Sequence, residues 1–520
     1  MDASFASISD LVRQHARQNP THKALVDGSD PSSSLDYGAL DERMDRIAAA
    51  LQASGLRAGD SIAMCAPASV DYAAVFLGAL RAGVVVAPLA PGSTPEALAR
   101  MLADAQARLF FVDEDTAARM PVPSTGTPTP IPARIRLDGS PGGLSLDAWL
   151  ARDGTKAPQL ADLQPGSPFN IIYSSGTTGV PKGIVQSHGM RWAHIQRGRP
   201  YGYSAHGVTV LATPLYSNTT LVCFFPTLAF GGCVVLMPKF SADGYLTLCE
   251  QYGATHTMLV PVQYQRLMAS EAFDRHDLSR FVSKFCTSAP FSAALKAEVL
   301  RRWPGGLIEI YGMTEGGGTC LLEAHLHPGK LHTVGRPAKG SDIRLIDEEG
   351  HEVPTGEVGE VVGHSAGMMI GYHGQPEKTR EVEWFNPEGK RYIRTGDIGR
   401  FDADGFLSLL DRKKDVVISG GFNIYPSDLE GVLQQHPAVL EAAVVGVPSA
   451  QWGESPMAFA VLRPGAALSE DQLLAWTNER LGKTQRLVAL QLVPELPRSP
   501  IGKVLKRDLR DASSQASGSS

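Results

Sequence analysis

Hydrophobic and polar residues follow one another along the first 330 positions in a pattern that predicts helices and strands in turn. Residues 8–18 carry Ile8, Leu11 and Val12 at helical spacing, and Pro20 is expected to end that helix. Because alternating strands and helices place crossover helices over parallel strands, the pattern predicts a mostly parallel sheet with helices on both faces. Strands are expected at 61–65, 84–88, 108–112 and 169–172, and helices at 70–82 and 94–107.

The pattern is interrupted at 120–143, where Pro, Gly, Ser and Thr dominate. We interpret this stretch as a surface connection, because the strand–helix alternation resumes at about 168 and continues to about 325. Beyond Gly335, short strand-like runs at 342–346 and 359–362 are separated by turn residues. They predict a small β-rich subdomain over about 335–410.

The last 110 residues have an α+β pattern of their own. A turn at 402–405 and a strand at 406–410 lead into a charged run, 411–415, after which we expect a helix at 426–435 and a strand at 442–446. A charged crossing suits a movable hinge, so the predicted domains are 1–410 and 411–520. The tail after Arg510 is rich in Ser and Ala and is expected to be disordered.

Composition narrows the class of protein. The 520 residues are 43% apolar and 20% charged, as in ordinary globular proteins. The formal net charge of −6 argues against a nucleic-acid or anionic-membrane partner. No apolar run approaches the roughly 20 residues that span a bilayer, and no signal peptide is visible. Six scattered cysteines without a Cys-x-x-Cys pair indicate reduced thiols of a cytoplasmic protein.

The stretch 173–183, Tyr-Ser-Ser-Gly-Thr-Thr-Gly-Val-Pro-Lys-Gly, is the strongest local signal for chemistry. Glycines permit a tight turn with inward N–H groups, hydroxyls add donors, and Lys182 adds a cation, which together suit a polyphosphate. The stretch is not a Walker A loop, because Lys182 is followed by Gly183 and Ile184. Taken alone, the run is equally compatible with a flexible surface loop.

Further motifs follow in a fixed order. They are Tyr311-Gly-Met-Thr-Glu315, Arg394-Thr-Gly-Asp397, Asp411-Arg-Lys-Lys-Asp415, Ser419-Gly-Gly-Phe-Asn-Ile-Tyr-Pro426 and Pro497-Arg-Ser-Pro-Ile-Gly-Lys503. With the loop, this order resembles the adenylate-forming superfamily of acyl- and aryl-CoA ligases, amino-acid adenylation domains and beetle luciferases. The resemblance extends from about residue 8 to about residue 510.

The resemblance implies a nucleotide site. A loop of Ser174, Ser175, Gly176, Thr177, Thr178, Gly179 and Lys182 would hold the β- and γ-phosphates of ATP. Tyr311, Gly312 and Met313 would lie against adenine, as would the segment Ser288-Ala289-Pro290. Thr314 would contact the α-phosphate, and Glu315 with Thr178 would hold Mg²⁺, which prefers oxygen ligands completed by phosphates.

The same resemblance assigns the ribose and the lid. Asp397 would accept both ribose hydroxyls, since one carboxylate accepts two hydrogen bonds, and Arg412 would assist there. Lys503 would bridge the substrate carboxylate and the α-phosphate, whereas Lys506 and Arg507 are expected to be solvated charges. Lys414 would be the hinge, and Gly420 with Gly421 would let the pantetheine arm of CoA pass close to the backbone.

The acid-binding residues depart from the family pattern. Pro214-Leu-Tyr216 is followed by Ser217-Asn218 instead of histidine, so Tyr216 or Asn218 is expected to gate the carboxylate. A Tyr-Lys-x-Pro motif is replaced by Gly482-Lys-Thr-Gln-Arg486. Segments 216–225 and 312–322, which include Gly316 and Gly317, contain no charged residue besides Glu315. A buried ammonium would need a carboxylate partner, so a hydrophobic or aromatic acid is expected.

The expected activity is ATP-dependent activation of a carboxylic acid to an acyl-adenylate, followed by transfer to CoA. The alternative is an amide ligase or a stand-alone adenylation enzyme that uses an amine or a carrier-protein thiol. A third alternative is a catalytically inactive nucleotide-binding or scaffold protein, and the presence of Glu315, Asp397 and Lys503 argues against it, because such a protein would not need them. A lysine acetyltransferase acting on Lys503 is a further expected partner, because acetylation removes that charge. The protein is expected to be a monomer or a homodimer.

Overall fold

The structure is a computed structural model that describes residues 4–120, 132–140, 143–154, 156–174, 182–420, 422–449, 451–499 and 503–517. The chain forms two compact units. The first comprises Met1–Leu331, Pro337–Asp342 and Gly363–Ile393, and the second comprises His332–Arg336, Ile343–Val362 and Arg394–Ser520. Asp411 lies inside the second unit, and the domain boundary at that residue stays a prediction.

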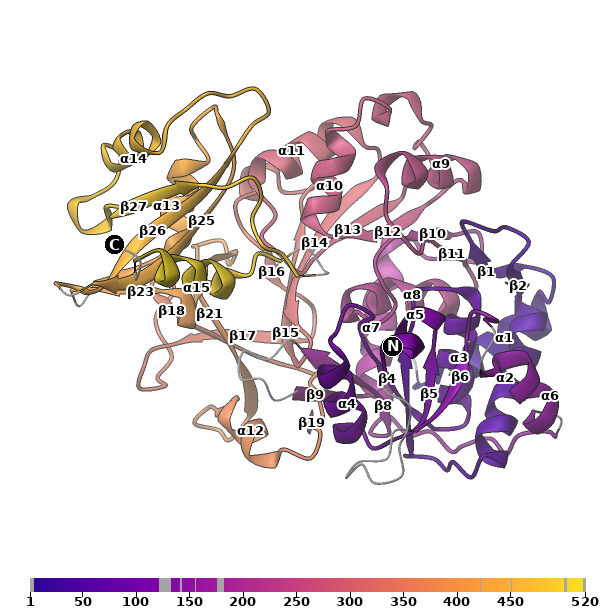
Figure 1. The fold of residues 1–520 in the computed structure, drawn as a ribbon. Helices are drawn as coiled ribbons and strands as arrows, with labels where there is room; N and C mark the ends of the chain where they lie inside the picture. The colour runs from indigo at the N-terminus through magenta and orange to yellow at the C-terminus, as the bar shows by residue number, and fades with distance from the viewer. Residues whose placement is uncertain are drawn as a thin grey trace. The chain divides into compact units, whose positions relative to one another are not determined.

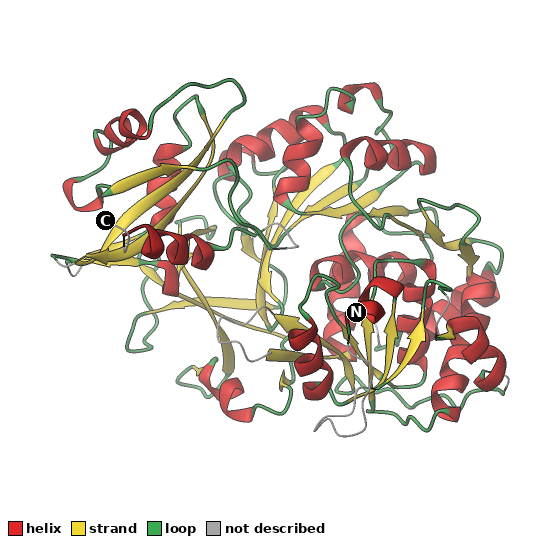
Figure 2. Cartoon of the chain, viewed as in Figure 1, coloured by secondary structure: helices red, strands yellow, loops and turns green. Residues whose placement is uncertain are grey.

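The first unit contains two large sheets (Figures 1 and 2). In the part of the chain that the structure describes, one has eight strands, all parallel from β8 to β7. Strands β8 and β9 pair in antiparallel fashion. The sheet order is β19 (Gly371–Tyr372), β9 (Lys182–Ser187), β8 (Pro168–Ser174), β4 (Val85–Pro88), β3 (Ser61–Cys65), β5 (Ala107–Val112), β6 (Ala133–Arg136) and β7 (Leu144–Ser145).

The other sheet has nine strands among the described residues, with a parallel centre and an antiparallel β14–β15 hairpin. Its order is β16 (Arg336–Pro337), β15 (Gly316–Glu323), β14 (Gly306–Met313), β13 (Ser283–Cys286), β12 (His256–Leu259), β10 (Val208–Leu211), β11 (Cys233–Leu236), β1 (Lys23–Asp27) and β2 (Ser34–Asp36).

The largest hydrophobic core lies between these two sheets. In β3, Ile62 and Met64 point into it, whereas Ala63 and Cys65 point to the opposite face, as the two-residue repeat of a strand requires. Helices that contribute to this core include α1 (Ile8–Gln18), α2 (Tyr37–Ala53), α3 (Val70–Arg81) and α8 (Asn218–Ala229). The opposite face of the eight-stranded sheet packs on α4 (Pro95–Asp104) and α5 (Glu114–Arg119).

The other helices described in the first unit include two, α6 and α7, that also reach the largest core, through Trp149 and Ile195. Trp303, fully buried, contacts aromatic rings that include Tyr245 of α9 and Tyr264 of α10. These helices are α6 (Leu146–Asp153), α7 (His188–Gly198), α9 (Ala242–Tyr252), α10 (Pro261–Met268), α11 (Ala293–Arg302) and α12 (Pro376–Glu381).

Two further sheets follow along the chain. One has the order β17 (Ser341–Ile346), β18 (Val358–Ser365), β21 (Arg391–Phe401) and β20 (Glu383–Phe385), and β22 (Leu407–Arg412) also pairs with β21. The other has the order β24 (Phe422–Ile424), β23 (Val417–Ser419), β26 (Gly453–Leu462) and β25 (Val439–Ser449), and β27 (Ala489–Leu492) also pairs with β26.

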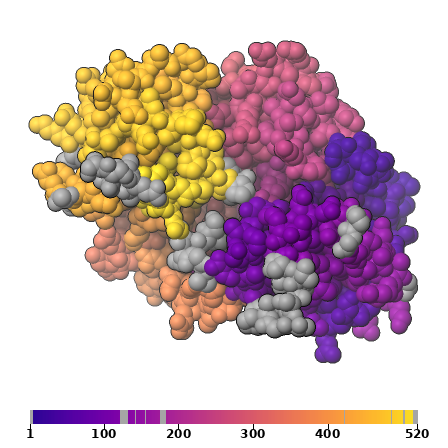
Figure 3. Space-filling view, in the orientation of Figure 1, coloured from indigo at the N-terminus to yellow at the C-terminus, as the bar shows by residue number. Residues whose placement is uncertain are grey.

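The last sheet is covered by helices through alternating residues of β25. Val444 belongs to the core under α13 (Pro426–Leu433) and α14 (Glu470–Asn478), whereas Val445 belongs to the core under α15 (Lys506–Ser517). In the space-filling view, the yellow C-terminal residues lie at the surface of this unit (Figure 3).

The structure confirms the strands and helices predicted over 8–112 to within a few residues, including Thr94, whose hydroxyl caps α4. The prediction of a disordered tail after Arg510 is wrong for residues 511–517, which belong to α15 (Lys506–Ser517), and residues 518–520 lie outside the described residues. Helix α15 continues to Ser517 because Leu509 is buried against β25 and Arg510 pairs with Asp415.

The prediction that residues 120–143 form a surface connection is wrong in part. Residues 133–136 form β6, which pairs with β5 and buries Ile135. Residues 121–131 and 141–142 lie outside the described residues. Among the helices described, none is long and apolar enough to cross a membrane.

Candidate active site

The predicted phosphate loop lies between two paired strands, β8 and β9. Strand β8 ends at Ser174 and β9 begins at Lys182, and these two residues pair across the hairpin. Ser175, Gly176, Thr177, Thr178 and Gly179 lie outside the described residues, so that part of the site stays a prediction.

Lys182 and Glu315 are linked by a tyrosine that the sequence reasoning missed. The Lys182 ammonium lies 5.4 Å from the centre of the Tyr372 ring, and the Tyr372 hydroxyl donates to Glu315 Oε1 at 2.9 Å. Burial and the Glu315 charge raise the pKa of Tyr372 far above its usual value, so it stays a neutral donor. No sequence signal pointed to Tyr372, because the strand that carries it, Gly371–Tyr372, is only two residues long and has no recognisable pattern.

Thr314 and Glu315 occupy the tip of the β14–β15 hairpin, between the paired residues Met313 and Gly316. Gly316 has a φ of 84°, and a Cβ there would lie 1.9 Å from the Gly367 carbonyl oxygen. Glycine is therefore required at this position, and the tight turn presents both functional side chains. The next residue, Gly317, also has positive φ and is buried.

Asn218 begins α8 and joins a polar network at the predicted gate. Its Oδ1 atom accepts from Arg191 at 2.8 Å and from Gln186 at 3.3 Å. Gln186 also donates to the Thr314 carbonyl oxygen at 2.8 Å. Asn218 and Thr314 are thus connected through one amide, whereas Tyr216 has no described hydrogen bond to this network. Gln186, at the end of β9, carried no motif that would have pointed to it.

Ser288 of the segment Ser288-Ala289-Pro290 has an unusual backbone. It follows β13 with a φ of 82°, a left-handed conformation that costs a side-chain-bearing residue about 1–2 kcal/mol. Its hydroxyl lies 2.5 Å from the Thr219 hydroxyl. This hydrogen bond ties the predicted adenine segment to the first turn of α8.

We expect Ser288→Gly and Ser288→Ala to affect stability differently. Glycine removes the backbone strain together with a hydrogen bond worth about 1 kcal/mol, so the free energy of unfolding should change little. Alanine keeps the strain and loses the hydrogen bond, and it should lower that free energy by about 1 kcal/mol. Urea unfolding of both variants checks this, and an alanine variant at least as stable as the glycine variant would contradict it.

The second unit holds the predicted ribose residues together. Asp397 and Arg412 are opposite residues of the β21–β22 pair, and Arg412 Nε lies 2.7 Å from Asp397 Oδ1. The Asp397 backbone N–H donates to the Thr395 hydroxyl at 3.0 Å. The carboxylate is thus held at the start of a strand pair beside a guanidinium that is 42% exposed.

Lys503 lies in the same unit. Its backbone N–H donates to the Ser499 hydroxyl at 3.1 Å, and the Ser499 backbone N–H donates to the Lys503 carbonyl oxygen at 2.8 Å. The side chain is exposed, but desolvation of its ammonium end and the nearby Arg412 charge lower its pKa, against the opposing effect of Asp397. Those effects indicate that Lys503, Arg412 and Asp397 face a common region.

The neighbours of Lys503 differ from one another. Arg507 is exposed, as predicted. The prediction that Lys506 is solvated is wrong, because its side chain is 18% exposed and its ammonium lies 2.9 Å from Glu430 and 3.8 Å from Asp411. Burial opposes its charge, yet the two carboxylates raise its pKa. Lys506 is therefore a structural ion-pair residue.

Lys414, the predicted hinge, and Gly420, one of the two predicted pantetheine glycines, are exposed. Lys414 is exposed within a single 3-10 turn, Lys413–Asp415. Gly420 has a φ of 56°, and a Cβ there would lie 2.8 Å from the Trp452 ring. Gly421 lies outside the described residues. A side chain at Gly420 would therefore require Trp452 to move, and the role of Gly420 toward pantetheine stays a prediction.

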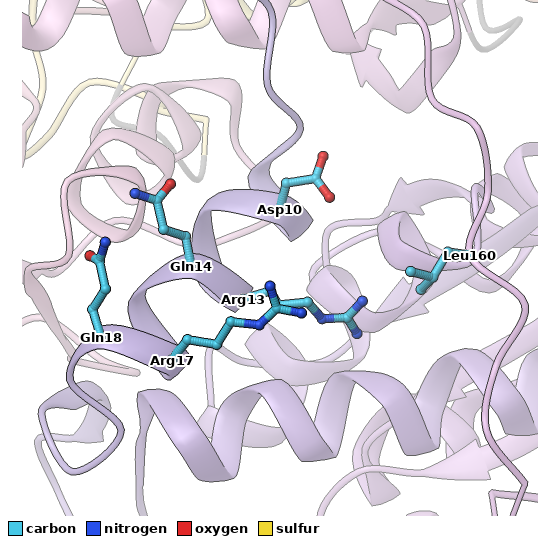
Figure 4. A pocket seen from close by; sticks show the side chains of 6 residues that line it. All are labelled: Asp10, Arg13, Gln14, Arg17, Gln18 and Leu160. Carbon is cyan, nitrogen blue, oxygen red and sulfur yellow. The ribbon is translucent and has the colours of Figure 1, made fainter.

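A hollow of about 520 Å³ beside α1 does not fit the predicted chemistry (Figure 4). Arg13 within it already pairs with Asp45 at 2.6 Å. The lining residues are Asp10, Arg13, Gln14, Arg17, Gln18 and Leu160, none of them a predicted site residue.

The predicted residues therefore form two groups. Lys182, Asn218, Ser288 and the hairpin tip at 314–315 belong to the first unit, and Asp397, Arg412 and Lys503 belong to the second. No group of three or more His, Cys, Asp or Glu side chains suited to a metal occurs among the described residues.

Two family models match the chain. The model described as "AMP-binding enzyme" covers residues 12–373, and that described as "AMP-binding enzyme C-terminal domain" covers residues 428–503. Three curated relatives are similar over nearly the whole chain. A sulfoacetate–CoA ligase of Cupriavidus necator is 33% identical and covers 97% of both chains. A feruloyl-CoA synthase of Amycolatopsis is 32% identical (96% of this chain, 97% of the relative). The fatty acid–[acyl-carrier-protein] ligase ScoC of Streptomyces coeruleorubidus is 32% identical (96% and 94%).

Solved structures have the same fold over almost their full length. ATP-bound MatB of Rhodopseudomonas palustris is 29% identical with a TM-score of 0.84, covering 97% of this chain and 98% of its own. The amide bond synthetase McbA of Marinactinospora thermotolerans is 27% identical with a TM-score of 0.84, covering 97% and 99%.

Proposed function

The chain belongs to the AMP-binding enzyme family, and from this premise we propose that it is an AMP-forming acid–CoA ligase. It activates a carboxylic acid with ATP to an acyl-adenylate and releases pyrophosphate. It then transfers the acyl group to the thiol of CoA and releases AMP. The family match and the CoA ligases among its relatives support both half-reactions.

The first half-reaction joins two anions, because a carboxylate attacks the α-phosphate while pyrophosphate leaves. Catalysis therefore depends on placing cations and aligning the reactants. In our proposal, Lys182 and the loop before it hold the β- and γ-phosphates, and Tyr311 lies against adenine. Thr314, at the hairpin tip, donates a hydrogen bond from its hydroxyl to the α-phosphate.

Asp397 binds the ribose hydroxyls in this proposal, and Arg412, whose Nε lies 2.7 Å from Asp397 Oδ1, orients the carboxylate. Lys503 supplies the positive charge between the substrate carboxylate and the α-phosphate. The observation that carries the proposal is geometric: Asp397 and Arg412 form an ion pair on neighbouring strands of the unit that also contains Lys503. A structural role alone would not need an exposed lysine beside that pair.

Glu315 is a suitable ligand for Mg²⁺. Its Oε1 atom is held by Tyr372, which leaves a fixed hard oxygen donor, and one carboxylate with phosphates is a usual magnesium shell. When bound, the ion would neutralise developing phosphate charge. Thr178, the second predicted ligand, belongs to the part of the loop that the structure does not describe.

For the second half-reaction we propose rotation of the lid about Lys414, which would withdraw Lys503 and bring in the turn that carries Gly420 and Gly421. The pantetheine arm of CoA would then pass the glycines. Two similar proteins fit the alternative acceptors, an amine or a carrier-protein thiol, since McbA is named as an amide bond synthetase and ScoC as an acyl-carrier-protein ligase.

A lysine acetyltransferase that modifies Lys503 is a further proposed partner.

The decisive experiment uses the full chain with ATP, Mg²⁺ and a panel of hydrophobic and aromatic acids. CoA, simple amines and a carrier protein are offered separately as acceptors, and AMP release and product mass are measured. We expect AMP formation to depend on CoA and to yield an acyl thioester. A product that forms with amines or carrier protein but not with CoA would favour the alternative. Failure to exchange pyrophosphate with any acid would contradict adenylation.

A further inference from the structure

Helix α7 directs three basic side chains along one face, at positions 191, 194 and 197. Arg191, 2% exposed, donates to Asn218 Oδ1 at 2.8 Å, to Asn170 Oδ1 at 3.2 Å and to Gln186 Oε1. His194 lies 3.4 Å from Arg191, and burial together with the two arginines lowers its pKa far below the usual value. The imidazole is therefore neutral, and the positive charge of this face comes from the arginines.

Arg197 is the outer member of the face. Its NH1 group donates to the Thr319 hydroxyl of β15 at 3.0 Å, and burial lowers its pKa. Among the described residues, the side-chain nitrogens that are both fully buried and without a hydrogen bond do not include any nitrogen of Arg197. Its remaining donors are thus partly desolvated but open to a ligand.

Neither arginine has a carboxylate partner in the described part of the chain. No Asp or Glu there lies within 4.0 Å of Arg191 or Arg197, and no acidic side chain contributes to the shift of either pKa. The residues that the structure does not describe contain a single acidic side chain, Asp2. A desolvated charge without a partner is costly, so two of them on one face point to an anion that arrives from outside the chain.

The Arg197 contact lies beside the predicted acid site. Thr319 Oγ1 is 3.5 Å from the position of a Cβ on Gly312, the residue after Tyr311. Arg191 shares Asn218 Oδ1 with Gln186, which binds the Thr314 carbonyl. The helices α7 and α8 also pack on each other (Figure 1). The basic face therefore borders the hairpin that presents Thr314 and Glu315.

We propose that the acid substrate carries a second anionic group, a carboxylate or a sulfonate, which Arg197 and Thr319 bind while the first carboxylate is adenylated. The body of the acid between the two groups remains apolar or aromatic, in keeping with segments 216–225 and 312–322, which contain no charged residue besides Glu315. This inference rests on the proposed function and narrows its substrate class. Guanidinium suits it because its planar fork matches the oxygens of both anions.

The test measures kcat/KM for pyrophosphate release with matched acids in the full chain. The probes are cinnamate, 4-carbamoylcinnamate, 4-carboxycinnamate and 4-sulfocinnamate, and a parallel series compares hexanoate with adipate. The wild-type protein should prefer the dianion of a series by about 10-fold or more. Arg197→Met should lower kcat/KM for that dianion by about 10²-fold and change the neutral acids by less than about 3-fold. For the dianion, kcat/KM of Arg197→Lys should lie between those of the wild-type protein and Arg197→Met.

Arg199→Met is the matched control, because Arg199 is exposed, bonds Gln196 and contacts none of the predicted site residues. This control should leave kcat/KM unchanged for every acid. Equal losses for neutral and dianionic acids in Arg197→Met, or a wild-type preference for the neutral acids, would overturn the inference while leaving the proposed function intact. If no acid supports pyrophosphate release, the proposed function itself fails. Should Arg197→Met not fold, the wild-type preference still decides.

Discussion

Replacing Lys503 by alanine is expected to slow acyl-adenylate formation by about 10²–10³-fold, which corresponds to about 3–4 kcal/mol of transition-state stabilisation. The reason is electrostatic. In our proposal its ammonium is the cation between two mutually repelling anions, in a region where Arg412 and Asp397 already shift its pKa. ATP–pyrophosphate exchange measures this step directly. Thioester formation from a preformed acyl-adenylate should change by less than about 10-fold, because Lys503 is withdrawn for that step.

Arg507→Ala is the matched control, since Arg507 is an exposed cation four residues further on, in α15. It should retain wild-type exchange. If Lys503→Ala kept exchange and lost only thioester formation, the roles assigned to the two half-reactions would be wrong. Equal losses in both half-reactions would indicate a general structural effect.

Replacing Lys296 by methionine is expected to lower the free energy of unfolding by about 3–5 kcal/mol at pH 8. Lys296 of α11 is 1% exposed, forms an ion pair with the buried Glu309 of β14, and donates to the Leu331 carbonyl oxygen at 2.7 Å. Its removal leaves a carboxylate without a counterion two residues before Tyr311. Urea unfolding measures the loss.

The loss should depend on pH with a defined sign. Burial, opposed by Lys296, raises the pKa of Glu309 to about 7, and without Lys296 the pKa rises further. A carboxyl whose folded pKa exceeds its unfolded value adds stability at low pH and loses it as pH rises through the folded pKa. Lys296→Met should therefore be much less destabilised at pH 5 than at pH 8.

Two further variants separate charge from packing. Adding Glu309→Gln to Lys296→Met should restore most of the stability at pH 8, because no charge remains buried. Arg301→Met, an exposed cation on the same helix, should change stability by less than about 0.5 kcal/mol. A Lys296→Met loss that is equal at pH 5 and pH 8, and is not rescued by Glu309→Gln, would mean that packing and not charge is responsible.

Particular elements show how far sequence reasoning reaches. Strand β3 was predicted residue for residue, since its apolar run is bounded by polar turns, and α4 was predicted through its cap at Thr94. Strand β6 and the end of α15 were missed, because each is stabilised by one or two long-range contacts, Ile135 in one and Leu509 with Arg510 in the other. Local composition cannot report a partner that lies far away in the chain.

The candidate site divides in the same way. The sequence by itself determined the family, the order of its motifs and the residues that carry them, because glycine-rich turns and motif spacing are written in consecutive positions. Only the tertiary structure decided that Tyr372 links Lys182 to Glu315, that Gln186 links Asn218 to Thr314, and that α7 delivers Arg197 to Thr319. These contacts join residues 32 to 190 positions apart, and a side chain's partner and desolvation depend on packing, which no local pattern encodes.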